Sequence, residues 1–239
     1  MAYTVDNLRA AVRALLQNQG PSAFPDDQLD QALLAGKRRL DRDYPYEKSK
    51  RLSAIAGGYY NLTTLVTDWA PNFSVIKRVI NPAPDVTTKE EVQHVPLNEI
   101  KVLEIEGSWY MRYDEQVASG RTLLIYYTVP WTVDGLADAT ATTLVADKQN
   151  ALEFICTSFA ALSLATKMSG STSRQIPGDI IDWGTKEAQY RRNAREWETL
   201  YMRELGMRED KPKPVSVIKD FDPVLSDGQS YLTHRRSLR

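Results

Sequence analysis

The residues whose types could do chemistry are few and scattered along the chain. The single cysteine, Cys156, lies in an apolar helical stretch and cannot form an intrachain disulfide or CxxC pair. The two histidines, His94 and His234, share no metal-ligand spacing with each other or with carboxylates. The sequence also lacks a Gly-x-Ser-x-Gly nucleophile motif. We therefore predict that Cys156 packs in the core and that both histidines are exposed to solvent. We predict no enzyme activity, no catalytic residue, no cofactor and no metal.

Three other clusters have simpler structural interpretations than ligand binding. The Ser169–Ser173 segment lacks the lysine and glycine spacing of a phosphate-binding loop and is interpreted as a linker. Lys89-Glu90-Glu91 offers neighbouring carboxylates that do not surround a cation, so we expect a solvated loop. Aromatic residues that could stack bases have few basic residues among them, which favours packing of a β layer or an interface. These aromatic residues are Trp109, Tyr110, Tyr113, Tyr126 and Tyr127.

The charged residues exclude an overall pull toward nucleic acid. Thirty Lys and Arg residues against thirty-one Asp and Glu residues give a net charge of -1. The local Lys37-Arg38-Arg39 triplet falls near the end of a helix, where cations complement the helix dipole. A DNA-binding accessory protein, using this triplet and the basic C-terminus, remains an alternative.

The elements that position these residues are helical at both ends of the sequence and β-like in the middle. Residues 1–49 predict two amphipathic helices, the first capped by Thr4 and the second opened by Pro25 and stopped at Tyr44-Pro45. Residues 50–145 contain short runs separated by turn residues and predict an antiparallel β insert, with a hairpin at Gly57-Gly58. Two further strands, 109–113 and 123–128, flank Gly120-Arg121.

Residues 146–206 return to helical spacing and complete the predicted frame. The first helix carries Leu152, Ile155, Phe159, Leu162 and Ala165 on one face and small residues elsewhere, so we expect it to be central. A charged final helix follows and ends at Gly206. It has an aromatic stripe that is either core or a subunit interface. The stripe residues are Trp183, Tyr190, Trp197 and Tyr201.

Residues 207–239 predict an extended C-terminal arm. The arm has three prolines and a basic end, yet it is more apolar than solubility requires, which indicates docking on a partner. Its candidate interface residues are Val215, Val217, Ile218, Phe221, Tyr231, Arg235 and Arg236. The fold class is therefore α+β, a helical bundle from the N- and C-terminal segments with an inserted antiparallel β region. The N-terminus does not resemble a signal peptide, and no window has the roughly 20 apolar residues of a membrane span. We expect folding in a cytoplasm and no membrane partner.

The order of these segments resembles the head-to-tail adaptor, or connector, proteins of tailed bacteriophages. The passages that carry the resemblance cover about residues 4–205 and include FPDDQLDQALLAGKRRLDRDYP, TLLIYYTVPWTVDG, DKQNALEFICTSFAALSLATKM and AQYRRNAREWETLYMREL. The similarity is one of pattern and order, because no single motif is diagnostic.

The resemblance implies a structural virion protein at the head–tail interface, assembled in the host cytoplasm. Its implied partners are further copies of itself in a ring, usually of twelve, the portal protein, and a tail or neck protein. Genomic DNA passes through the channel without sequence-specific binding. Another neck or tail-completion protein, such as a stopper, is the alternative within the same particle.

Overall fold

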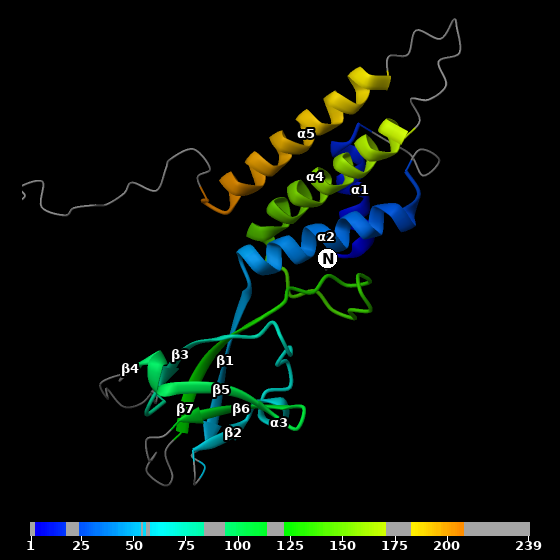
Figure 1. Ribbon diagram of the computed structural model, residues 1–239. Helices are drawn as coiled ribbons and strands as arrows, with labels where there is room; N and C mark the ends of the chain where they lie inside the picture. The colour runs from blue at the N-terminus through cyan, green and yellow to red at the C-terminus, as the bar shows by residue number, and fades with distance from the viewer. Residues whose placement is uncertain are drawn as a thin grey trace, which may run out of the picture.

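The computed structural model describes residues 3–17, 24–53, 55, 58–83, 94–113, 122–170 and 183–207 (Figure 1). These residues form α-helices and antiparallel sheets, so the predicted α+β class is confirmed. The long helices lie together at the top of Figure 1 and the strands lie below them. The connections between the two parts run from α2 into β1 and from β7 back to α4.

Helix α1 begins, and helix α2 begins and ends, at the residues that the sequence indicates. Helix α1 (Val5–Leu15) starts with a capping box, in which the Thr4 hydroxyl accepts from the Asn7 N–H and the Asn7 side chain accepts from the Thr4 N–H. Helix α2 (Asp26–Asp43) follows Pro25 and stops at Tyr44. Its first-turn carboxylates face the positive end of the helix dipole.

Helix α4 (Ala146–Gly170) is the central helix, because α1, α2 and α5 (Trp183–Glu204) all contact it. Small residues allow these contacts to be close. A Cβ atom added to Gly36 of α2 would lie 2.6 Å from the Cys156 sulfur, so the glycine is required for the approach of α2 to α4. On the α5 side, the buried Ser158 hydroxyl donates to the carbonyl of Ala194 over 2.9 Å.

Three expectations about α4 need correction. Leu162, predicted on the buried face, is 40% exposed, whereas Leu164 is buried, because helices cover α4 from several directions instead of along one stripe. The helix continues through Ser169 and Gly170, where a linker was expected. By length and composition α4 also qualifies as a possible membrane span, which the sequence analysis did not identify, although much of that stretch is buried against the other helices.

The strands form two antiparallel sheets. The first has the order β1-β7-β3-β4 and the second has the order β2-β6-β5. Strand β1 pairs with β7 along its whole length, from Tyr46 opposite Val129 to Ser53 opposite Thr122. The strands of the first sheet are β1 (Tyr46–Ser53), β7 (Thr122–Val129), β3 (Ile76–Ile80) and β4 (His94–Val95). Those of the second are β2 (Tyr59–Asn61), β6 (Ser108–Tyr113) and β5 (Ile100–Ile105). Short helices α3 (Leu62–Leu65) and η1 (Leu97–Glu99) lie between strands.

The hairpin predicted at Gly57-Gly58 is wrong. The strands on either side of Gly58 do not form a hairpin, because β1 pairs with β7 and β2 pairs with β6. Gly58 does have the expected positive φ of 70°, but it uses this conformation to pass between sheets, and its carbonyl accepts from the Tyr113 N–H. The two strands predicted on either side of Gly120-Arg121 are present as β6 and β7, and they belong to different sheets. Gly57, Gly120 and Arg121 lie outside the described residues.

Two large hydrophobic cores and one small cluster, of Ile80, Ala83 and Leu124, stabilise the described residues. One lies between the sheets and combines residues of both, including Tyr60, Met111 and Ile125, all fully buried. The other lies among the helices and also contains Trp131, Val133, Leu136 and Leu144. These last four residues precede α4 and fall in the range 50–145 that the sequence groups with the β insert. They pack with the helices, and the backbone N–H of Val5 donates to Asp134, which ties this segment to α1.

Candidate partner-binding surfaces

A buried carboxylate, Asp41, fixes the junction between the helices and the sheets. The side chain is 5% exposed and accepts hydrogen bonds from the Lys37 ammonium at 2.7 Å and from the Trp131 N–H at 2.8 Å. Burial raises the pKa of Asp41, and this effect outweighs the opposing influence of Lys37 and of the Trp131 N–H. The Trp131 indole in turn donates to the Tyr44 carbonyl and stacks on Tyr46. The last turn of α2 is thereby held at a fixed position over the first sheet.

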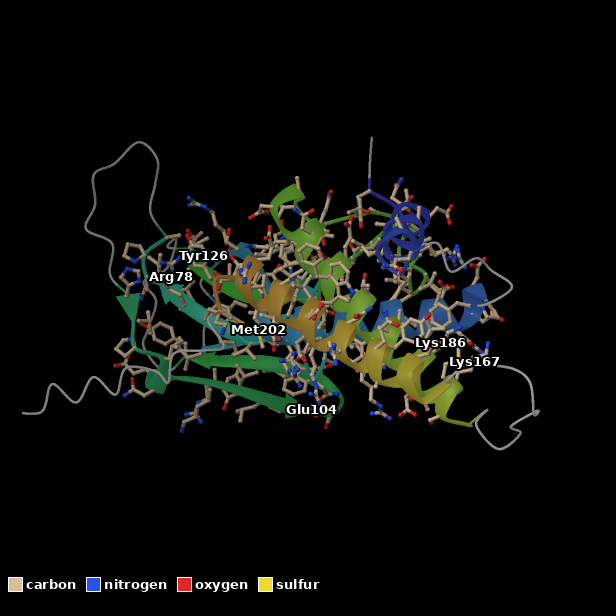
Figure 2. All side chains as sticks on the ribbon, turned by 90° about the horizontal axis from the view of Figure 1, so that it is seen from above. Arg78, Glu104, Tyr126, Lys167, Lys186 and Met202 are labelled. Carbon is tan, nitrogen blue, oxygen red and sulfur yellow. The ribbon has the colours of Figure 1, made fainter. Side chains whose placement is uncertain are left out.

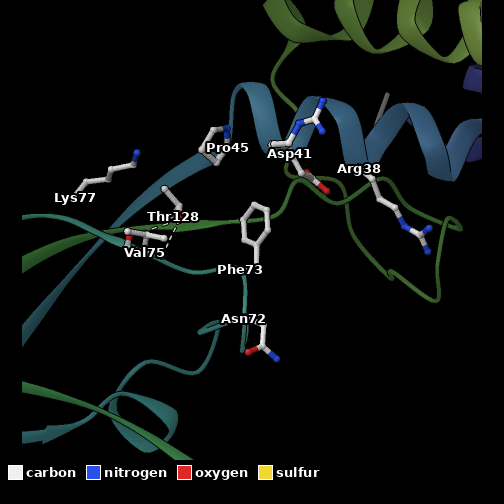
Figure 3. Close-up of a pocket in the computed structure, with 9 residues that line it drawn as sticks. Arg38, Asp41, Pro45, Asn72, Phe73, Val75, Lys77 and Thr128 are labelled. Carbon is white, nitrogen blue, oxygen red and sulfur yellow. Dashed lines mark hydrogen bonds between the residues drawn. The ribbon is translucent and has the colours of Figure 1, made fainter. Parts of the chain in front are cut away.

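A groove of about 420 Å³ lies beside this junction, between the last turn of α2 and the strands β3 and β7 (Figure 3). Its apolar lining comes from Pro45, Phe73 and Val75. Val75 is 56% exposed, although its backbone is held by two hydrogen bonds with Thr128. An apolar floor that is positioned by the backbone but open to solvent is typical of a binding surface.

Cationic side chains border this apolar floor. Arg38 and Arg42 extend from α2 and Lys77 extends from β3, and all three are exposed. Figure 3 shows Arg38 and Lys77 at opposite ends of the groove with the Phe73 ring between them. The carboxylate in the lining, Asp41, is buried and bound to Lys37. The groove therefore complements an apolar side chain with acidic neighbours.

The predicted basic triplet divides into residues with different surroundings. Lys37 pairs with Asp41, and Arg39 pairs with Asp43 at 2.5 Å. Burial raises the pKa of Asp43, but its hydrogen bonds from Arg39 and Tyr201 outweigh this effect and lower it. Two of the three cations are thus already engaged by carboxylates, which weakens the triplet as a phosphate-binding site.

The aromatic stripe of α5 is only partly buried. Tyr201 is fully buried and its hydroxyl donates to Asp43 over 3.0 Å, whereas Tyr190 and Trp197 are half-buried. The Trp197 ring stacks on Phe154 of α4 with 5.7 Å between ring centroids. The side chain of Trp183 lies outside the described residues. One stripe thus combines a core tyrosine with aromatic edges that remain accessible to a partner.

The outer edge of the second sheet is apolar. Strand β5 pairs only with β6 within the described chain, and Val102, Leu103 and Ile105 are 36%, 36% and 42% exposed. Glu104, on the same strand, lies at the margin of the molecule in Figure 2. Strand β5 carries one cation and one anion, Lys101 and Glu104, whereas the edge strand β1 of the first sheet carries three cations, Lys48, Lys50 and Arg51. Charged edges resist strand addition, whereas apolar edges favour it.

The sequence-predicted aromatic residues of the sheets serve in packing. Tyr113 and Tyr127 are buried in the core between the sheets. Tyr126 lies on the outer face of its sheet, and the Arg78 guanidinium sits 4.1 Å from the ring centroid (Figure 2). Trp109 packs against the same core and Tyr110 is half-buried. Three of these five residues therefore contribute to the β core.

The chemistry-bearing residues are not brought together in the described part of the chain. Cys156 is fully buried in the helical core, and burial raises the pKa of its thiol. His94 is exposed on β4, as expected. Among the described residues, no group of three or more His, Cys, Asp or Glu residues could hold a metal ion. Lys89–Glu91, Ser171–Ser173 and His234 lie outside the described residues.

The arm residues proposed from sequence also lie outside the described residues, namely Val215, Val217, Ile218, Phe221, Tyr231, Arg235 and Arg236. The sequence patterns did not indicate Asp41, Phe73 or Val75. Val75 directly precedes β3, and it lines the groove together with residues of α2 that are distant along the chain. No local pattern identifies such a position.

The comparisons with known proteins give no relative on which to base a function. The sequence matches no protein-family model, and a search of curated proteins finds no match.

Proposed function

We propose that this chain is a structural subunit of a ring-forming head-to-tail adaptor of a tailed bacteriophage. The ring docks on the portal and continues the DNA channel toward a tail or neck protein, with twelve subunits the number that the resemblance implies. The proposal treats α1, α2, α4 and α5 as one bundle built from both ends of the sequence, the β region as its insert and residues 207–239 as an extended arm. It assigns the chain no enzymatic role and locates it in the virion.

The observation that carries the assembly part of this proposal is the apolar outer edge of β5. Exposed Val102 lies on one face of the strand, and Leu103 and Ile105 lie on the other. A partner that covers only one face of β5 would therefore leave some of these apolar side chains exposed. The backbone groups on the outer edge of β5 are available for pairing with another chain. A neighbouring subunit that covers this edge would bury both rows of side chains and satisfy the backbone.

The described surfaces also have the asymmetry that a closed ring needs. In a ring, one face of a subunit contacts a different face of the next subunit. The β5 edge and the half-buried aromatic edge of α5 belong to different cores and different segments of the chain. They therefore offer two distinct contact surfaces, which a two-fold dimer does not require.

Assembly can be tested with matched variants of the full chain. Leu103→Lys with Ile105→Lys places two charges on one exposed face of β5, whereas Glu104→Lys reverses a charge on the same strand without removing an apolar side chain. We expect rings of the unchanged protein and of Glu104→Lys in negative-stain images, and binding of these rings to purified portal particles. The double variant should remain monomeric in size-exclusion chromatography with light scattering.

Three outcomes separate this proposal from its alternatives. If the unchanged protein forms no rings and does not join portal particles, the adaptor function is wrong. Binding only to portal particles that already carry an adaptor would indicate a stopper. Tight duplex DNA binding with a steep salt dependence, lost when Arg38 is neutralised, would favour a DNA-binding accessory protein.

A further inference from the structure

The last turn of α5 contacts the C-terminal end of α2, the helix that supplies part of the groove lining. The Tyr201 hydroxyl, in the last turn of α5, donates to Asp43 in the last turn of α2. The Arg39 guanidinium lies 3.9 Å from Glu198 of α5. The C-terminal ends of α2 and α5 consequently lie on the same side in Figure 1. The chain therefore leaves α5 close to the turn that carries Arg38 and Arg42 into the groove lining.

The sequence beyond α5 contains one segment with the composition that the groove complements. Residues 219–223 read Lys-Asp-Phe-Asp-Pro, so a single aromatic residue has an aspartate on each side. A segment of this composition offers one aromatic ring for the apolar floor and two carboxylates for the cationic border.

Other apolar residues of the arm lack this match. Val215, Val217 and Ile218 have no acidic residue directly beside them, and Tyr231 is followed within five residues by His234, Arg235 and Arg236. Like charges at a cationic border disfavour binding. Phe221 is thus the arm residue whose surroundings are complementary to the groove.

We propose that residues 219–223 bind the groove of their own chain in the unassembled subunit. Phe221 is fourteen residue steps beyond Met207, a distance of up to about 46 Å when extended, so the segment has ample reach from the end of α5. A tethered segment also acts at an effective concentration of about millimolar, which makes weak contacts sufficient. This contact is independent of ring assembly, and it gives Phe221 an intramolecular site before any partner is present.

The contact can be measured by disulfide trapping in the full chain. Arg42→Cys places a thiol in the groove lining, and Pro223→Cys places one beside the aspartates, so Phe221, Val75, Arg38 and Lys77 all remain. Cys156 is fully buried and does not compete. Lys50→Cys with Pro223→Cys is the matched control, because Lys50 is exposed on β1 and does not line the groove. We expect the groove pair to form an intrachain disulfide about tenfold faster than the control pair.

Variants of the arm and of the groove then test the assigned contacts in the Arg42→Cys, Pro223→Cys background. Phe221→Ala should slow the trapping reaction about tenfold, and so should Asp220→Lys with Asp222→Lys. Adding Arg38→Glu and Lys77→Glu to the aspartate variant should restore the trapping rate, because the two arm charges and these two groove charges are then all reversed. Equal rates for the groove and control pairs, no effect of Phe221→Ala, or a purely interchain disulfide would overturn the proposal. Each altered groove residue is exposed, and unfolding curves of the reduced variants serve as the check that each variant is folded.

Discussion

Gly36→Ala tests how closely α2 packs on α4. A Cβ atom at Gly36 would lie 2.6 Å from the Cys156 sulfur and 2.9 Å from both the backbone nitrogen and the Cα of Cys156. Ordinary carbon contacts begin near 3.4 Å, so the two helix backbones must separate by about 0.5 Å. Rotation of the cysteine side chain can move the sulfur but cannot relieve the backbone contacts.

The expected result is a net destabilisation of about 1–2 kcal/mol. Overpacking of a core costs about 1–3 kcal/mol, and the backbone contacts below 3.0 Å place Gly36→Ala in the upper part of this range, whereas replacing glycine by alanine inside a helix returns roughly 0.5–1 kcal/mol. Urea unfolding followed by circular dichroism measures the difference, provided that the denaturant slope is unchanged. Gln31→Ala, on the exposed face of α2, is the control and should stay within about 0.5 kcal/mol of the unchanged protein. If Gly36→Ala is as stable as the unchanged protein or more stable, the close contact between α2 and α4 is wrong.

Three further predictions concern the described residues. Asp43→Asn and Asp41→Asn should have opposite pH dependences. Burial raises the pKa of Asp43, but hydrogen bonds from the neighbouring guanidinium and phenol lower it below 3.8, so its stabilising contribution is lost as the pH falls through the lowered value. Burial raises the pKa of Asp41 above 3.8, so its contribution to stability is lost as the pH rises through the raised pKa. Urea unfolding across both pH ranges measures the stability that each variant loses. A pH dependence of the same sign for both variants would contradict this prediction. Ser158→Ala removes the 2.9 Å hydrogen bond to Ala194 and should cost about 1 kcal/mol in thermal or urea unfolding, and no loss would mean that this bond is not formed. The buried Cys156 thiol, whose pKa burial raises, should react with an aromatic disulfide reagent only as fast as the chain unfolds, and rapid labelling of the folded chain would refute its core position.

The helix ends were the most predictable feature, because their signals are local. Thr4 caps α1, Pro25 opens α2, and Gly206 has the positive φ of 71° expected after the end of α5. Each of these signals involves a side chain or a backbone conformation within a few residues of the helix end. The α+β class follows equally from the change in spacing between the ends and the middle of the sequence.

Strand pairing and solvent exposure could not be predicted in the same way. A glycine pair permits a tight turn, but the turn does not determine which strands pair, and Gly58 connects two sheets. Leu162 fits a helical stripe, yet it is exposed because the neighbouring helices cover other sides of α4. These features depend on contacts between residues that are distant along the chain.

The candidate surfaces show the same division. The sequence by itself determined the types of side chains available, including the lone core cysteine, the aromatic stripe of α5 and the Asp-Phe-Asp segment of the arm. Only the tertiary structure placed Val75 and Phe73 beneath the cations of α2 and left the apolar side chains of β5 on an open edge. The physical reason is that local patterns record what a segment can bury, whereas packing between distant segments decides what remains exposed.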